Sequence, residues 1–129
     1  DQGSIDFLAA LNSPTSIAEI KEYKANEKQE VLFFGDSEVE LGIKKKKQMQ
    51  EVISLILDKP VKIIISSTIP DKIKGFNKDQ NKLKSRALHL RTFLINLGIS
   101  HNRITIKNYK KRSISQNWKN ELVLSFIGT

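Results

Sequence analysis

The sequence predicts an α/β domain of the α+β kind, in which two main helices pack on a mixed sheet. Short runs of β-favouring residues alternate with two longer segments whose apolar side chains recur at helical spacing. Their order along the chain is strand, helix, strand, helix, strand, strand. With 129 residues, 39% of them hydrophobic and 28% charged, the chain is long and apolar enough for one domain with its own core.

The first strand and the first helix are predicted between residues 31 and 58. The run Val-Leu-Phe-Phe at 31–34 is followed by the turn sequence Gly-Asp-Ser, which is typical of a buried strand and its end. Residues 41–58 then carry apolar side chains at helical spacing, and Pro60 stands just past them. The lysines at 44–47 oppose the helix dipole, so we expect them to extend into solvent or to meet an anion.

The second strand and the second helix follow the same pattern. Residues 61–65 are mostly β-branched and predict a short buried strand. The polar cluster Ser-Ser-Thr at 66–68 is interpreted as loop-capping residues, at the start of a loop that reaches residue 78. Residues 79–97 place five apolar side chains on one stripe, and Gly98 is expected to end this helix in a left-handed conformation.

Two strands are predicted in the last third of the chain. Residues 103–107 alternate between apolar and polar side chains, which indicates a strand with one solvated face. Residues 108–120 are polar and basic, and the Lys-Lys-Arg run at 110–112 is interpreted as a solvated loop, with docking to an acidic partner as the alternative. Residues 121–127 predict a final strand, which could close a hairpin with the third.

The formal net charge of +8 and the absence of cysteine limit the functions to be considered. A positive surface attracts polyanions such as nucleic acid, anionic lipid headgroups or carboxylate-rich cell-wall polymer. Lysine outnumbers arginine and stacking aromatic residues are few, which disfavours specific readout of bases. The apolar runs are far shorter than the roughly 20 residues of a membrane-spanning helix. The start at Asp1 is interpreted as a processed end or a boundary.

Residue patterns for catalysis or metal binding are weak. The only two histidines, His89 and His101, have no cysteine or paired carboxylate at ligand spacing. The six glycines are scattered, so they form no phosphate-binding loop. We therefore expect a protein that is not an enzyme and that needs no metal and no cofactor.

Four residue pairs connect this chain to a known family. Arg86-Ala87, Phe93-Leu94, Gly98-Ile99 and Arg103-Ile104 stand in the order and spacing of the OmpA-like C-terminal domain, which the chain resembles over about residues 31–126. The resemblance implies a βαβαββ sandwich, with a mixed sheet and both main helices on one face. It also divides the chain into an N-terminal arm, residues 1–29, and an OmpA-like domain, residues 30–129.

The resemblance also implies a tentative peptidoglycan-binding site. In the family an aspartate after the second strand and an arginine of the second helix hold the charged groups of the peptidoglycan stem peptide. The arginine corresponds to Arg86, whose planar fork suits a carboxylate. The family's Gly-His-Thr-Asp is replaced by Ser-Ser-Thr-Ile at residues 66–69, which keeps Thr68, lacks the aspartate and leaves Asp71 as its nearest substitute. Asp79 stands where the family usually has asparagine. The alternative is that Arg86 is structural and pairs with Asp71 or Asp79.

The function that the resemblance implies is a structural or tethering module of a bacterial cell-envelope complex. The lysine-rich surface and the arm are similar to those of accessory lipoproteins in the outer-membrane core complex of type IV secretion systems. This implies a periplasmic, outer-membrane-associated protein with a lipid anchor upstream of Asp1, other complex subunits as partners and weak peptidoglycan binding. Nucleic acid is not expected as a partner, and a basic nucleic-acid-binding domain is kept as the alternative, to be recognised by steep salt dependence.

Overall fold

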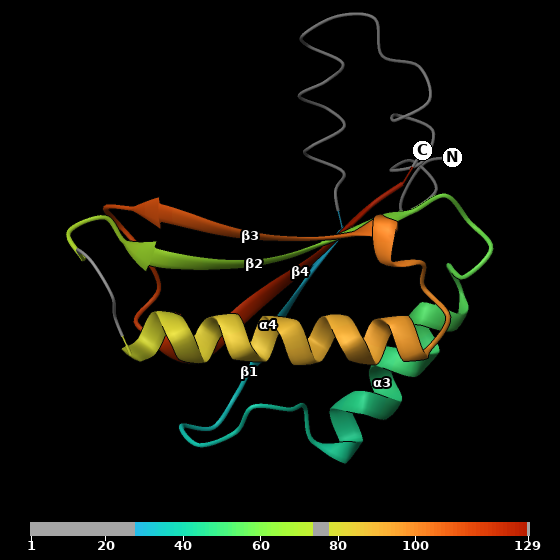
Figure 1. Cartoon of the computed structure of the whole chain (residues 1–129), viewed down its shortest axis with the longest axis horizontal. Coiled ribbons are helices and arrows are strands. Elements are labelled where there is room, and N and C mark those ends of the chain that lie inside the picture. Colours follow the sequence, from blue (N-terminus) through green and yellow to red (C-terminus); the bar gives the residue numbers. More distant parts are fainter. Residues whose placement is uncertain (1–27, 74–77, 129) are drawn as a thin grey trace, which may run out of the picture.

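The computed structural model describes residues 28–73 and 78–128. The predicted N-terminal arm therefore lies almost entirely outside the described residues. The elements within them follow the predicted strand and helix order (Figure 1), with two short 3₁₀ helices between the later strands. They are β1 (Lys28–Phe33), α3 (Ile43–Ser54), β2 (Lys62–Pro70), α4 (Lys78–Asn96), η1 (His101–Arg103), β3 (Ile104–Lys111), η2 (Trp118–Asn120) and β4 (Glu121–Ile127).

The four described strands form one mixed sheet in the order β1-β4-β2-β3. β4 pairs antiparallel with both β1 and β2, whereas β2 and β3 are parallel. The predicted hairpin between the last two strands is therefore wrong. β4 takes an inner position because Leu122, Leu124, Ser125 and Phe126 are all buried, whereas β3 is exposed from residue 107 onward and suits an edge.

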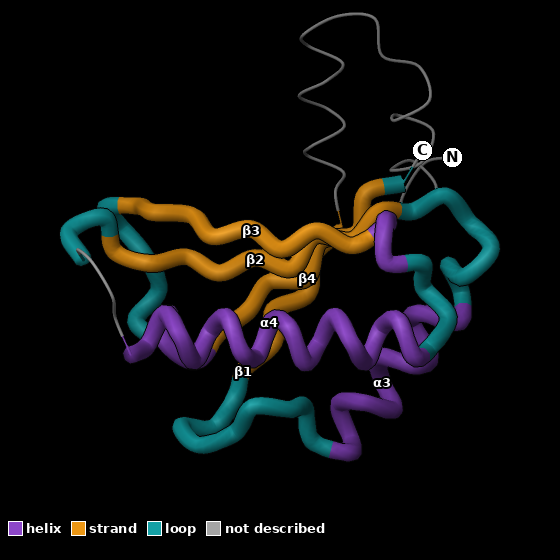
Figure 2. Tube along the Cα trace, viewed as in Figure 1, coloured by secondary structure: helices purple, strands orange, loops and turns teal. Residues whose placement is uncertain are grey.

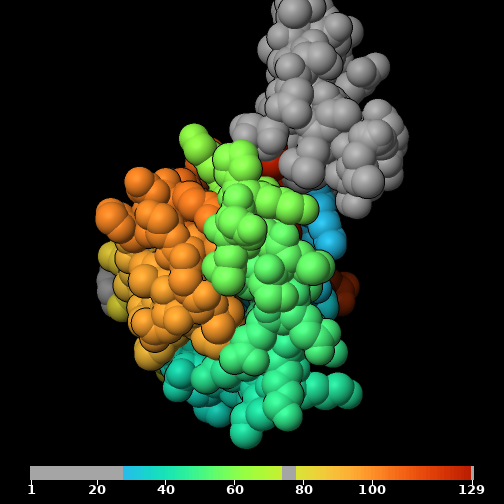
Figure 3. Space-filling view, turned by 90° about the vertical axis from the view of Figure 1, so that its right-hand side faces the viewer, coloured from blue at the N-terminus to red at the C-terminus, as the bar shows by residue number. Residues whose placement is uncertain are grey.

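Both helices lie on the same side of the sheet (Figures 1 and 2). Figure 3 shows α3, in green, packed beside the C-terminal part of α4, in orange. The core between the helices and the sheet is apolar, and alternate residues of each strand point into it. Its most deeply buried members are Leu32, Met49, Ile53, Ile63, Ile65, Leu83, Leu94, Ile99, Leu122 and Leu124.

β2 and β3 are both longer than predicted. Residues 66–68 were expected to cap a loop, and this is wrong, because β2 continues through them to Pro70. Ser66 donates to the backbone carbonyl of Val123 over 3.4 Å, and Ser67 donates to the side chain of Asn108, so the hydroxyl groups have partners inside the sheet. The run at 110–112, interpreted as a solvated loop, is strand as far as Lys111, because β3 follows β2 residue by residue.

The ends of the two helices agree with the sequence prediction for α4 and differ from it for α3. α4 ends at Asn96, and Gly98 follows with a φ of +112°, in the left-handed conformation that was predicted. Beyond it, the backbone N–H of Ile99 donates to the carbonyl of Leu94 over 3.2 Å. α3 is shorter than the helix predicted at residues 41–58. Leu41 is buried but lies before the helix begins, and residues 55–58 form turns after it ends. Gly42 is its N-cap and supplies no side-chain hydrogen bond.

Candidate functional site

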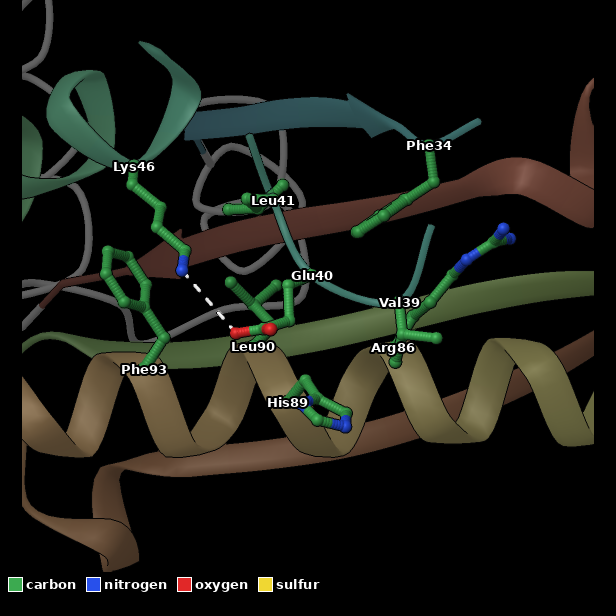
Figure 4. Close-up of a pocket in the computed structure, with 9 residues that line it drawn as sticks. All are labelled: Phe34, Val39, Glu40, Leu41, Lys46, Arg86, His89, Leu90 and Phe93. Atoms are coloured by element: carbon green, nitrogen blue, oxygen red, sulfur yellow. Dashed lines mark hydrogen bonds and ion pairs between the residues drawn. The ribbon is translucent and has the colours of Figure 1, made fainter. Parts of the chain in front are cut away.

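Arg86 is the most heavily hydrogen-bonded side chain among the described residues, and its side chain is fully buried. It extends from α4 toward the strand end that carries Phe34 (Figure 4), and its guanidinium carbon lies 5.0 Å from the centre of the Phe34 ring. An arginine side chain has five N–H groups, and each of them has a protein acceptor here. The acceptors are the carbonyls of Gly35 at 2.7 Å, Asp36 at 3.4 Å, Glu38 at 2.7 Å and Lys119 at 2.9 Å, and the side-chain oxygen of Asn120 at 2.8 Å.

The charge of Arg86 is accommodated by carbonyl dipoles and two nearby carboxylates. Burial lowers the pKa of Arg86 from its usual value, while the negative charges of Asp36 and Glu38 act in the opposite direction. Asp36 is itself held in place, because its carboxylate accepts a hydrogen bond from Asn120 over 2.7 Å. Arg86 therefore ties the loop after β1 to the 3₁₀ helix before β4.

This arrangement agrees with a structural role for Arg86, but with partners other than the expected ones. Asp71 lies 3.8 Å from Arg112, and Asp79 lies 3.6 Å from Lys119, so neither carboxylate is paired with Arg86. The main acceptors of Arg86 are backbone carbonyls. Every residue has one, so the sequence does not show which of them will bond to Arg86. Asn120 was missed because it follows a polar stretch without a recognisable motif.

The structure separates the four candidate peptidoglycan-binding residues. Thr68 is half-buried on β2 and alternates with Ile69, which is buried on the helix side, so Thr68 faces the opposite side of the sheet from Arg86. The side chain of Asp71 is 47% exposed just after β2, where its backbone N–H donates to the carbonyl of Lys111. Asp79 lies in the first turn of α4. Asp71 is the most exposed carboxylate of the set.

The pocket drawn in Figure 4 is too small for an organic ligand. It lies beside Arg86 between the loop after β1 and the two helices, and its volume of about 10 Å³ is at most that of one water molecule. Lys46 and Glu40 form an ion pair of 3.5 Å at its edge, and the Lys46 ammonium lies 5.7 Å from the ring centre of Phe93.

The described part of the chain holds neither a candidate metal site nor a candidate membrane span. Across residues 28–73 and 78–128, no group of three His, Cys, Asp or Glu side chains could hold a metal ion. Neither α3 nor α4 has the length and hydropathy of a membrane-spanning helix.

Solved structures with the same fold are found, although no protein-family model and no curated protein matches the chain. The OmpA-like domain of FopA1 from Francisella tularensis is 17% identical, with a TM-score of 0.57 over 78% of this chain and 71% of that one. The peptidoglycan-associated lipoprotein from Burkholderia pseudomallei is 15% identical, with a TM-score of 0.56 over 93% of this chain and 99% of that one.

The C-terminal domain of Helicobacter pylori MotB is 15% identical, with a TM-score of 0.56 over 78% of this chain and 85% of that one. At these identities the likeness concerns the fold. The βαβαββ order, the mixed sheet and the two helices on one face therefore give this chain the fold of OmpA-like domains.

Proposed function

We propose that this chain is a non-enzymatic tethering module of the bacterial periplasm, which holds together parts of an envelope complex. The observation that carries the proposal is the shared fold, which extends over 93% of this chain and 99% of a peptidoglycan-associated lipoprotein.

Peptidoglycan binding is part of the proposal, and its expected strength follows from Arg86. A wall carboxylate could reach this side chain only by displacing acceptors in the loops that Arg86 fastens. Binding through Arg86 therefore costs loop rearrangement and is weak. Asp71 is the better first contact, because its exposed carboxylate can accept a hydrogen bond from a wall ammonium group in place of Arg112.

The finer proposal is an accessory, outer-membrane-associated component of a type IV secretion core complex, with a lipid anchor upstream of Asp1. The net charge of +8 supports this assignment only in a general way, because it favours acidic protein or wall partners over other basic proteins.

Co-sedimentation with purified peptidoglycan sacculi tests wall binding. We expect weak, saturable pelleting of the wild type, which falls several-fold in Asp71→Ala and is unchanged in Asp58→Ala, an exposed aspartate without a described partner. If both variants pellet equally and pelleting vanishes at moderate salt, the protein is attracted to the wall by its overall charge and has no specific wall site. No pelleting of the wild type would remove peptidoglycan from the proposal.

A further inference from the structure

β3 is an edge strand whose outer side is unpaired within the described part of the chain. The backbone carbonyl of Lys111 points toward β2, where it accepts a hydrogen bond from Asp71 over 3.0 Å. Backbone groups alternate in direction along a strand, so those of Ile106, Asn108 and Lys110 point away from β2. These residues offer donors and acceptors to a further strand.

A groove of about 290 Å³ lies between this edge and the first half of α4. Asn108 and Lys110 line it on the strand side, and Asn81 and Lys84 line it on the helix side. Its apolar lining comes from Ile69 and Leu83, which are buried. Figure 1 shows the start of α4 running beside the ends of β2 and β3. Side chains of an added strand that point toward the helices would enter this groove.

The groove and the strand edge are positively charged. Lys84 and Lys110 line the groove, and no Asp or Glu does so among the residues that the structure describes. Lys107 and Lys111 add two exposed cations on the same strand. The neighbouring acids, Asp71 and Asp79, already lie near Arg112 and Lys119.

We propose that the free edge of β3 and this groove bind an extended acidic segment of a partner protein as an added strand. Backbone hydrogen bonds to residues 106–110 supply affinity, and alternate side chains of the segment enter the groove and supply specificity. This inference rests on the tethering function proposed above and adds to it the class of partner protein that the chain binds.

The lysines at the β3 edge favour an acidic partner strand over a second copy of this chain. Lysines on an edge strand repel other basic strands and so limit aggregation. A second copy of this chain would bring its own β3 lysines against those of the first, which disfavours pairing of the two edges. A strand with glutamates at the positions that face the groove meets the attraction of Lys84 and Lys110 instead, and its apolar residues lie on the other face of the sheet.

The test is a fluorescence polarisation titration with a short labelled peptide in which glutamate and valine alternate. Lys110→Ala and Lys110→Pro both remove the lysine charge, but only the proline also removes the N–H that points to the open edge. Lys84→Glu reverses a charge in the groove, and Lys44→Glu reverses an exposed charge on α3 as the matched control.

We expect saturable binding that Lys84→Glu weakens about tenfold, while Lys44→Glu changes the Kd less than about twofold. Lys110→Pro should bind about tenfold more weakly than Lys110→Ala, provided both have the wild-type circular dichroism spectrum. Two further peptides carry N-methyl groups on alternate residues, one on the odd and one on the even positions. Only the peptide whose methylated nitrogens face β3 should lose binding.

No saturable binding of the wild type, or equal Kd values for Lys110→Pro and Lys110→Ala, would overturn the proposal. Equal effects of Lys84→Glu and Lys44→Glu would also overturn it, since binding would then follow overall charge. Sacculus pelleting by Lys110→Pro reports separately on the proposed function, because the wall contacts proposed there do not use the edge of β3.

Discussion

Nη1 of Arg86 donates a hydrogen bond of 2.8 Å to the side-chain oxygen of Asn120, whose amide nitrogen in turn donates to Asp36 over 2.7 Å. A helix residue, the residue before β4 and the loop after β1 are thereby joined in one polar network. The network lies at one edge of the apolar core and fixes how the two loops meet.

Arg86→Ala should destabilise the domain by about 3 kcal/mol or more, because it removes a fully buried side chain and leaves several part-buried carbonyls without their donor. Arg86→Lys should recover part of the loss, since an ammonium has three donors and no planar fork. Urea unfolding followed by circular dichroism measures both. Arg91→Ala, which removes a helix arginine without a described partner, should stay within about 0.5 kcal/mol of wild type. A loss below about 1 kcal/mol in Arg86→Ala would contradict the structural role.

Arg103→Ala should loosen the end of α3. The side chain of Arg103 donates to the carbonyls of Ile56, Leu57 and Val61 at 2.8 to 2.9 Å, so it holds the turn that leads from α3 into β2. Arg103 itself is less buried than Arg86, so water replaces part of the lost bonding. We expect a loss of about 1–2 kcal/mol and faster amide exchange confined to residues 53–61, measured by hydrogen exchange. Unchanged exchange there would contradict this role.

Gly98→Ala should cost about 1–2 kcal/mol. The φ of +112° disfavours any side chain, and an added Cβ would lie 3.2 Å from the Leu57 side chain. Gly42→Ala is the matched control, because nothing lies within 4 Å of its added Cβ and its φ is −67°. Thermal unfolding should place Gly42→Ala within about 1 kcal/mol of wild type. Equal losses of stability in the two variants would contradict the claim that the positive φ of Gly98 causes the destabilisation.

Gly42→Asp should stabilise the domain by about 1 kcal/mol. The N-cap of α3 has no side-chain hydrogen bond, and the first turn holds no acidic residue but begins the lysine run at 44–47. An aspartate would cap the helix and offset these charges. Part of the gain should disappear at high salt, whereas Gly42→Ser should retain its smaller gain. Chemical unfolding at two salt concentrations measures the difference, and a gain that is independent of salt would contradict the electrostatic part.

The sequence was most informative where a signal is local. The apolar stripe of α4, its end at Gly98 and the bounds of β4 follow from periodicity and glycine chemistry, and the structure confirms them. The lengths of β2 and β3 could not be predicted, because Ser66, Ser67 and Asn108 have little intrinsic preference for a strand and are held there by pairing. The place of β4 between β1 and β2 is likewise set by long-range pairing.

The candidate site was less predictable than the fold. The resemblance singled out Arg86, but its partners are mostly backbone carbonyls of distant loops, which carry no mark in the sequence. Asp71 and Asp79 were expected near it as acidic residues, yet they lie nearest to Arg112 and Lys119, two cations that become neighbours only through the fold.

The proposed function is the tethering of components at the bacterial envelope. Fractionation of its own bacterium, with the protein detected by a tag, tests this most directly. The account predicts that the protein is recovered with outer-membrane material, remains there after a high-salt wash and leaves it together with other envelope proteins when the membrane is dissolved in detergent. Recovery of the protein in the cytoplasm, bound to nucleic acid and released by salt, would contradict the account.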